Sequence, residues 1–236
     1  MAAADSASEK APGTWTQVSA ALVLVGMLAG GFWLLVKTSA AESTAARVPA
    51  TCSTEAPSKA PPKSDKGAAH ASGARLCEAL NRTDLAALLG TPDEIPKSAN
   101  GSDGSFGLPG AKFARPSAEV EFDTYTVSVA ATYDGTPVGG SGTYLPSALE
   151  QKFLGRPAYL YSDRTISIAL RLDGRDAGTG PGVPVRALTV AADTEDSGGS
   201  FDVALWRADG RMPDDAVLLR VAEKVLPTLK AWGAGT

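Results

Sequence analysis

The stretch EVEFDTYTVSVAATYD, residues 119–134, decides the fold class. Its apolar side chains occupy even positions up to Phe122 and odd positions from Tyr125 onward. Alternation with a period of two is typical of a β-strand that buries one face. The phase changes at Asp123 and Thr124, which indicates a turn or a bulge at that point.

Further strand signals follow at residues 158–162, 165–172, 185–192 and 201–207. They are separated by turn-forming sequences, among them Ser162-Asp163-Arg164 and Asp196-Ser197-Gly198-Gly199. We expect one face of the resulting sheet to be dry and to hold Ile166, Ile168, Leu170, Leu172, Leu188, Val190, Phe201, Val203 and Leu205. The opposite face should be exposed to water or thinly covered.

Helical patterns lie on both sides of the strands. In residues 72–90, SGARLCEALNRTDLAALLG, leucines recur at helical spacing before and after a break near Asn81, and Gly90 ends the second piece. Near the C-terminus, Pro213 and two acids open a helix with one apolar stripe, which Pro227 should kink. The sequence therefore predicts an N-terminal helix pair and a C-terminal helix.

Two intervening segments carry weaker signals. Residues 91–117 contain four prolines and four glycines, so we expect loops and at most short strands. Ser147-Ala148-Leu149-Glu150 matches a capping box, which predicts a short helix ending at Gly155. Together these patterns predict an α+β fold with a mainly antiparallel sheet packed against the helices.

An uncharged apolar run precedes this domain. It covers residues 15–36, WTQVSAALVLVGMLAGGFWLLV, and as a helix would be about 33 Å long, enough to cross a bilayer. The alternative is a signal peptide cleaved near Ser39-Ala40-Ala41, but the run is longer than the apolar core of such peptides. We therefore predict one transmembrane helix.

The anchor divides the chain into four parts. We expect a short cytoplasmic tail at 1–14, the transmembrane helix at 15–36, a flexible Ala/Ser/Pro/Lys linker at 37–72 and an extracytoplasmic domain at 73–236. Lysine and arginine close to the helix do not decide the orientation. The cysteines favour export of the domain, which places it outside the cell membrane.

The chain has two cysteines, Cys52 in the linker and Cys77 in the first helical segment. In an exported chain such a pair is interpreted as a disulfide. Two free thiols or a metal pair are weaker alternatives, because the chain has no CxxC motif and zinc would need two more ligands.

The composition and motifs argue against catalysis. A net charge of −4 lacks the basic footprint of a nucleic-acid binder. The only histidine, His70, lies in the linker, where we expect it to be solvated, so no serine–histidine–aspartate triad is expected in the domain. Residues 193–198 begin like a calcium loop, but a hairpin turn explains them better. We expect no cofactor, no metal site and no catalytic residues.

Aromatic side chains give a sharper signal for binding. Tyr159 and Tyr161 share one strand face, and Trp206 lies on the side opposite Phe201 and Leu205. Rigid amphipathic rings beside polar residues are typical of binding surfaces, although packing under a second layer would explain them equally well. The candidate binding surface comprises Trp206, Tyr159, Tyr161 and Arg171.

The order of these parts resembles a known family. The anchor, the spacer with one cysteine, and the runs GARLCEALNRTDLAALLG, TYTVSVAATYD, LGRPAYLYSDRTISIALRLDG, FDVALW and LLRVAEKVLPTL resemble an uncharacterised, streptomycete-type family of actinobacterial single-pass membrane proteins. More distantly, the domain resembles actinobacterial envelope lipoproteins and the photosystem-subunit P/Mog1-like sandwich. This resemblance implies the cell envelope and transfers no catalytic residues.

We therefore expect a membrane-anchored extracytoplasmic binding or interaction domain, with the membrane and an envelope protein or small ligand as partners. One alternative is an envelope carrier or sensor that holds a small apolar ligand between sheet and helices. A second alternative is a hydrolase of unrecognised type. A closed apolar pocket would favour the carrier, and a cleft with converging acids would favour the hydrolase.

Overall fold

The computed structural model describes residues 48–54, 70–108, 111–145, 147–169 and 178–233 of the chain. The predicted membrane helix at residues 15–36 lies outside these ranges. Within them, no helix is both long enough and apolar enough to span a membrane.

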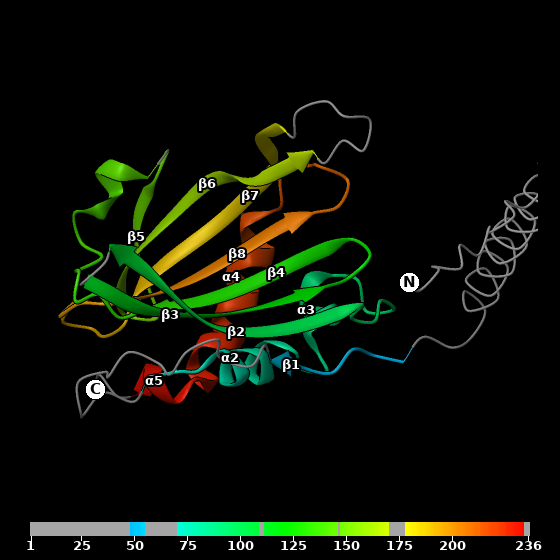
Figure 1. The fold of residues 1–236 in the computed structure, drawn as a ribbon, viewed down its shortest axis with the longest axis horizontal. Coiled ribbons are helices and arrows are strands. Elements are labelled where there is room, and N and C mark those ends of the chain that lie inside the picture. The colour runs from blue at the N-terminus through cyan, green and yellow to red at the C-terminus, as the bar shows by residue number, and fades with distance from the viewer. Residues whose placement is uncertain (1–47, 55–69, 109–110, 146, 170–177, 234–236) are drawn as a thin grey trace, which may run out of the picture. The chain divides into compact units, whose positions relative to one another are not determined.

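The described domain has an α+β fold built on one sheet of eight strands (Figure 1). The strand order is β1-β2-β3-β4-β8-β7-β6-β5. Every neighbouring pair runs antiparallel except β1 and β2, which are parallel. The predicted α+β class and mainly antiparallel sheet are confirmed.

The strands are β1 (Ser53–Thr54), β2 (Ser98–Leu108), β3 (Ala111–Glu121), β4 (Tyr125–Thr132), β5 (Leu149–Phe153), β6 (Arg156–Ala169), β7 (Gly178–Ala191) and β8 (Ser200–Arg207). The α-helices are α2 (Gly73–Leu80), α3 (Leu85–Leu89), α4 (Asp215–Val225) and α5 (Lys230–Gly233). Two short 3₁₀ helices are η2 (Ser141–Tyr144) and η3 (Leu226–Thr228).

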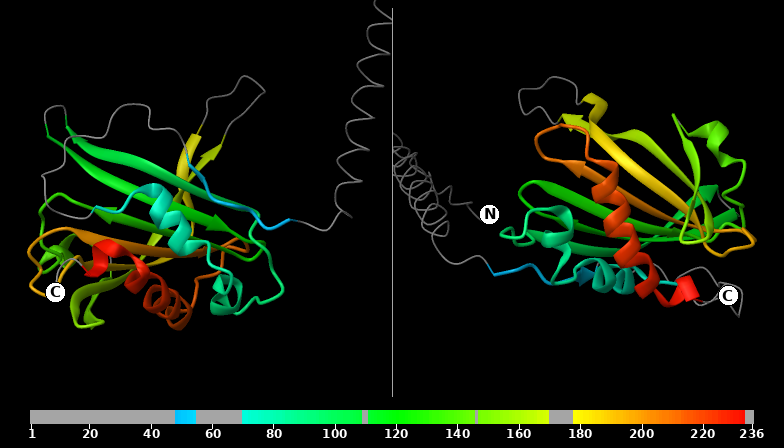
Figure 2. Two further views of the ribbon diagram at one scale, coloured as in Figure 1. Left: turned by 90° about the horizontal axis from the view of Figure 1, so that it is seen from below. Right: turned by 180° about the vertical axis from the view of Figure 1, so that it is seen from behind.

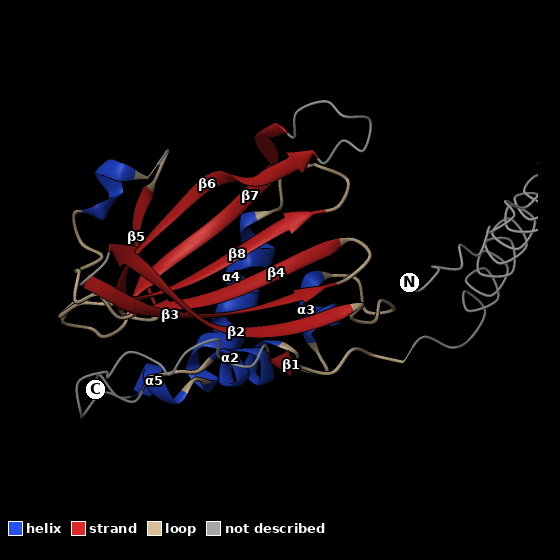
Figure 3. Ribbon diagram, in the orientation of Figure 1, coloured by secondary structure: helices blue, strands red, loops and turns tan. Residues whose placement is uncertain are grey.

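The long helices pack on one face of the sheet. In the view from behind, α4 lies across the sheet (Figure 2, right), and α2 lies beside β2 and β3 (Figure 3). The predicted helix pair is present as α2 and α3, and Gly90 ends α3 in the left-handed conformation. The C-terminal helix begins after Asp214, whose side chain accepts a hydrogen bond from the Ala216 amide, and ends at Val225, two residues before Pro227.

The core lies between this sheet face and the helices. The predicted dry-face residues of β7 and β8 are all buried: Leu188, Val190, Phe201, Val203 and Leu205. They pack with leucines and valines of the helices, namely Leu76 and Leu80 of α2 and Leu218, Val221 and Val225 of α4. Burial of these apolar side chains is the main source of stability.

Two buried arginines fix the C-terminal helices. Arg186 of β7 makes a two-pronged ion pair with Asp215 at the start of α4, with N–O distances of 2.6 and 2.8 Å. Arg156 of β6 donates to the backbone carbonyls of Ala192 and Trp232. Both ends of the C-terminal segment are thus tied to the sheet.

The expectation of loops at residues 91–117 is wrong. This segment contributes most of β2 and β3, two strands of eleven residues each that pair along their whole length. Pro116 lies one position beyond Ser117, where the pairing of β3 with β4 stops. A strand that has only one neighbour at that point tolerates a residue without an amide hydrogen.

The predicted helix ending at Gly155 is also wrong. Residues 149–153 form β5, which pairs with β6 through a tight turn. Leu154 and Gly155 both have positive φ angles, 50° and 82°. Such two-residue turns match the twist of the strands they join, so the turn geometry overrides the capping-box signal.

The strand predicted to break at residues 162–164 is instead continuous. β6 runs through this point with a register shift between Arg164 and Ile166. Beyond the shift, the Ile166 side chain is 78% exposed, so its assignment to the dry face is wrong. The side chains of Ile168, Leu170 and Leu172 lie outside the described residues. A bulge of this kind bends a strand and turns its distal part away from the core.

Candidate functional site

No described α-helix packs on the second face of the sheet, although the short η2 segment and its flanking residues cover one corner of it over Tyr159. Along β4 and β8, buried residues alternate strictly with half-buried ones, as expected when only one face is covered. We call this second surface the open face and define it by Asn100, Ser102, Arg115, Ser117, Glu119, Ser128, Ala130, Tyr161, Ala187, Thr189, Asp202, Ala204 and Trp206. The alternation places all of them on the same side of the sheet.

One row of side chains crosses six strands of the open face. The strand registers align Asn100, Glu119, Ser128, Ala204, Ala187 and Tyr161. The middle of the row holds only small side chains, whereas its two ends hold larger polar or aromatic ones.

A polar network lies beside this row. The Thr189 hydroxyl donates to Oδ1 of Asp202 at 2.5 Å, and Nη2 of Arg115 lies 3.6 Å from Oδ2 of the same carboxylate. Tyr161 is close enough to Asp202 for the carboxylate charge to raise the pKa of the Tyr161 hydroxyl. The network links β3, β8, β7 and β6 across the sheet.

Burial perturbs two groups in the network. Burial raises the pKa of Asp202, and the Thr189 hydrogen bond and the Arg115 charge oppose that rise. Burial also raises the pKa of Tyr161, with the nearby Asp202 charge acting in the same direction. Asp202 consequently holds a proton more tightly than an ordinary aspartate.

A polar hollow lies at the β2 end of the open face. It has a volume of about 400 Å³ and is lined by Ser53, Asn100, Gly101, Ser102, Ser117, Ala118 and Glu119. Partial burial raises the pKa of Glu119, and the negative charge of the neighbouring Glu121 raises it further by a smaller amount. The side chains around the hollow offer hydroxyl, amide and carboxyl groups to a ligand.

The structure separates the residues of the predicted binding surface. Trp206 and Tyr161 are half-buried and belong to the open face. Tyr159 is only 6% exposed and packs against Val138 and Ala191, so its expected place at the surface is wrong. Arg171 lies outside the described residues.

Sequence reasoning missed Arg115 and the hollow, and it assigned Asp202 to the wet face without naming it as a site residue. Arg115 and Asp202 are distant in the chain and meet only because β4 places β3 and β8 on its two sides. A usable signal was present for Asp202, since a charged residue within the alternating run 201–206 must point away from the apolar face.

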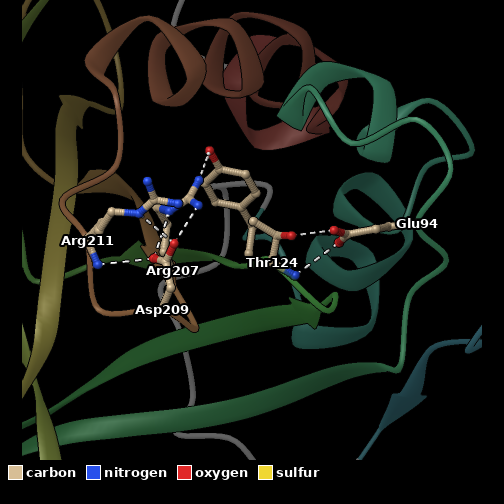
Figure 4. Close-up of polar contacts among 6 residues, drawn as sticks. Glu94, Thr124, Arg207, Asp209 and Arg211 are labelled. Atoms are coloured by element: carbon tan, nitrogen blue, oxygen red, sulfur yellow. Dashed lines mark hydrogen bonds and ion pairs between the residues drawn. The ribbon is translucent and has the colours of Figure 1, made fainter.

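A second polar cluster supports the turns at the other end of β4 (Figure 4). Asp209 accepts hydrogen bonds from Arg207 at 2.9 and 2.7 Å and from Nε of Arg211 at 2.7 Å. Arg207 also donates to the Tyr125 hydroxyl at 2.7 Å. Hydrogen bonds from Arg207 lower the pKa of Asp209, and those bonds raise the pKa of Arg207. Its donors and acceptors satisfy one another, which indicates a structural role.

Glu94 completes this end of the domain. Its carboxylate accepts hydrogen bonds from the amide and the hydroxyl of Thr124, in the turn between β3 and β4 (Figure 4). The Thr124 carbonyl accepts a bond from the Ala208 amide. The sequence pattern predicted either a turn or a bulge at Asp123 and Thr124, and the structure has a turn there.

The predicted disulfide between Cys52 and Cys77 is present. It joins the segment before β1 to the buried side of α2, since Cys77 has no exposed surface. β1 itself lies within the range predicted as a flexible linker and pairs with Asn100 and Gly101 of β2. The segment around β1, within the predicted linker, is thus part of the folded domain.

The prediction that His70 is solvated is wrong. Its ring stacks on Tyr133 with centroids 3.9 Å apart and an interplanar angle of 8°, so it is not the solvated linker side chain that we expected. The next residue, Ala71, donates its amide to the Tyr133 hydroxyl at 2.8 Å. Together, the two contacts dock the approach to α2 onto the sheet.

A groove of about 380 Å³ lies between α2 and the C-terminal segment. Ala71, Ala79 and Leu229 supply apolar lining, and Arg75, Glu78 and Lys230 supply charges. Arg75 and Glu78 form an ion pair at 3.1 Å.

Neither the groove nor any other part of the described ranges has a group of three or more histidine, cysteine, aspartate or glutamate side chains that could hold a metal ion.

A protein-family model matches residues 9–148, more than half of the chain. The chain belongs to this family. It is a family of unknown function, DUF6215, so membership brings no catalytic or binding residues with it. The match includes β1 to β4, whereas β5 to β8 and the C-terminal helices lie beyond it. No curated protein and no solved structure matches the chain.

Proposed function

We propose that the chain is a membrane-anchored, extracytoplasmic binding domain of the cell envelope without catalytic activity, and that the open face is its binding surface. The observation that carries this proposal is the alternating burial of β4 and β8, which leaves most of one sheet face without a covering α-helix. Polar and aromatic side chains on such a face are suited to recognition.

The charged groups support binding better than catalysis. Asp202 is hydrogen-bonded to Thr189 and lies near Arg115, and the hollow beside Glu119 is open to solvent. A hydrolytic site would need an acid and a base or nucleophile converging on one enclosed point. The described side chains of the open face are instead spread across six strands.

The apolar run at residues 15–36 and the orientation predicted from the sequence support the proposed location of the domain outside the cell membrane. The disulfide between Cys52 and Cys77 is consistent with an oxidising compartment. The role in the envelope thus rests on sequence pattern and cysteine chemistry.

The groove between α2 and residues 228–231 favours a second candidate, a carrier of a small apolar ligand. Its volume is within the lower part of the range of small-molecule sites. Ala79→Trp would fill the groove from α2. If the chain is a carrier, apolar molecules that copurify with the wild type should be missing from this variant, as measured by mass spectrometry of solvent extracts.

Crosslinking in living cells tests the main proposal. A photo-reactive benzophenone side chain at Ser128 would project from the centre of the open face. The matched control places it at Arg220, an exposed position on α4. We expect adducts of defined mass at Ser128 and none at Arg220 in the cells that naturally make the protein.

Equal labelling at both positions, or labelling at Arg220 alone, would contradict the proposal that the open face is the binding surface. Absence of adducts at Ser128 under conditions that crosslink a known envelope complex would contradict it as well.

A further inference from the structure

We propose that the ligand of the open face is a neutral oligosaccharide that lies along the row from Asn100 to Tyr161, with one sugar unit seated in the polar hollow. This inference rests on the proposed function and specifies the chemistry of its ligand. Four features of the open face favour such a ligand: the length of the row, the hydrogen-bonding groups of the hollow, the aromatic rings and the small net charge.

The row favours an extended ligand. It crosses six strands, and five interstrand spacings of about 4.8 Å give a length of roughly 24 Å. Ser128, Ala204 and Ala187 give the middle of the row small side chains only, and Ser128 and Ala204 keep part of their surface exposed. A compact ligand would leave most of this length unused.

The hollow favours hydroxyl groups. Ser53, Ser102 and Ser117 each carry a hydroxyl that can both donate and accept a hydrogen bond. Asn100 offers a planar amide and Glu119 a planar carboxylate, which can bridge neighbouring hydroxyls of a sugar ring. The Ser53 hydroxyl already donates to Oδ1 of Asn100 at 2.6 Å, which orients the amide.

The aromatic rings favour a ligand with flat apolar faces as well as polar edges. Tyr161 ends the row, and Trp206 lies two residues from Ala204 on the same side of β8. Sugar rings combine C–H faces with hydroxyl edges, and aromatic side chains accept such faces. Both rings are half-buried, so each retains surface for contact.

The charge of the open face gives strongly charged partners little net attraction. Of its defining residues, the carboxylates of Glu119 and Asp202 and the guanidinium of Arg115 leave a formal charge of −1. Arg115 lies 3.6 Å from Asp202, within ion-pair distance. An anionic chain would find only one positive side chain, and a basic one would find little net attraction.

Titration of the full chain in detergent with four neutral tetrasaccharides tests this inference. The probes are tetramers of glucose, mannose, galactose and N-acetylglucosamine, with a uronic-acid tetramer as the anionic comparison. We expect saturable binding of at least one neutral tetramer and weaker binding of the anionic one. Glu119→Gln and Asn100→Ala should each weaken the neutral complex by about fivefold or more.

The matched control is Glu78→Gln, the same chemical change at an exposed position of α2. It should bind the neutral tetramer as the wild type does. The inference is overturned if no neutral tetramer binds up to about 10 mM, a range that covers weak affinities. It is also overturned if Glu119→Gln and Glu78→Gln bind equally, or if the anionic tetramer binds best.

The crosslinking experiment separates this outcome from the parent proposal. Adducts at Ser128 without sugar binding would overturn the oligosaccharide assignment and leave the open face as a binding surface for a partner of another class. Absence of both would overturn the two together.

Discussion

The guanidinium of Arg156 lies 3.7 Å above the ring centre of Trp232, although 76 positions separate the two residues in the chain. Arg156 is 2% exposed and also donates to the carbonyls of Ala192 and Trp232. Burial lowers the pKa of Arg156, partly offset by the charge of Asp193. One side chain thus joins the start of β6, the end of β7 and α5.

Arg156→Lys should destabilise the domain despite keeping the charge. A lysine lacks the planar fork that reaches two carbonyls while stacking on an indole. We expect the free energy of unfolding in denaturant to fall by about 2–4 kcal/mol, since buried carbonyls lose their donors. Arg220→Lys on the exposed side of α4 is the control and should change the value by less than about 0.5 kcal/mol. Equal effects at both sites would show that Arg156 contributes no specific contact.

The two tryptophans of the described domain should respond oppositely to truncation. Trp232 is 8% exposed and contacts Phe201 at 5.7 Å between ring centres, so Trp232→Ala should cost about 3–5 kcal/mol. Trp206→Ala should move the melting temperature by only a few degrees, because the ring is half-buried on the open face. The same Trp206 variant should give fewer crosslinks from Ser128. A large loss of melting temperature in Trp206→Ala would instead assign that ring to the core.

Asp202→Asn and Asp209→Asn should shift stability in opposite directions near pH 7. Asp202 has a raised pKa in the folded state, so folding holds its proton more tightly and wild-type stability falls as pH rises from the ordinary aspartate value through the raised one. Its replacement should stabilise the domain above that window. Asp209 has a lowered pKa, so its contribution is present above the ordinary value and is lost as pH falls through the folded value. Its replacement should therefore destabilise the domain.

Unfolding curves for both variants across pH provide the measurement. At strongly acid pH, where both carboxyls are protonated, each variant should approach the wild type. If the difference for Asp202→Asn keeps its size down to that pH, the effect comes from packing and not from the charge.

The disulfide should keep a cut linker attached. Trypsin can cleave after Lys59, Lys63 or Lys66, all of which lie between Cys52 and Cys77 in the sequence. In a Lys37→Gln, Arg47→Gln variant, which removes the trypsin sites between residue 36 and Cys52, trypsin added to intact cells should not release the domain into the medium until a reductant opens the bridge. Gel electrophoresis of the medium with and without reductant measures the release.

Two results would contradict parts of this expectation. Release by a cut confined to these lysines without reductant would show that the bridge is absent. Protection of all three lysines until the cells are lysed would reverse the predicted orientation of the domain.

Local sequence pattern predicted the centre of the sheet well. Val127, Val129, Val203 and Leu205 alternate with polar residues, and each lies buried on the face that the period of two assigns to it. The caps at Gly90 and Asp214 were also predictable, because their conformational and hydrogen-bonding roles depend on near neighbours.

The strand β2 was not predictable in this way. Its sequence, SANGSDGSFGL, has few residues with strand propensity. It is held by pairing with β3 and by close backbone contact with α2: a Cβ on Gly101 would lie 2.4 Å from the Gly73 carbonyl oxygen. Tertiary contacts of this kind leave no periodic signal.

The candidate site was predictable only in part. The alternating run 201–206 placed Trp206 opposite the core. The proximity of Asp202, Arg115 and Tyr161 depends instead on strand order and register. Tyr159 has the same phase as Tyr161, yet η2 and its flanking residues pack over it, and the Tyr159 hydroxyl accepts a bond from the Gly140 amide at 3.3 Å. Alternation identifies a face and does not show which part of it another segment covers.

The bond between Cys52 and Cys77 also determines where tension on the chain enters the domain. A pull applied before Cys52 passes through the sulfur atoms into α2, at a residue with no exposed surface, and bypasses the loop between the two cysteines, which are 25 positions apart. The two-residue pairing of β1 with β2 therefore carries little of that force. A domain held in this way resists being unzipped from its edge strand, because the first element to yield would be a helix packed into the core.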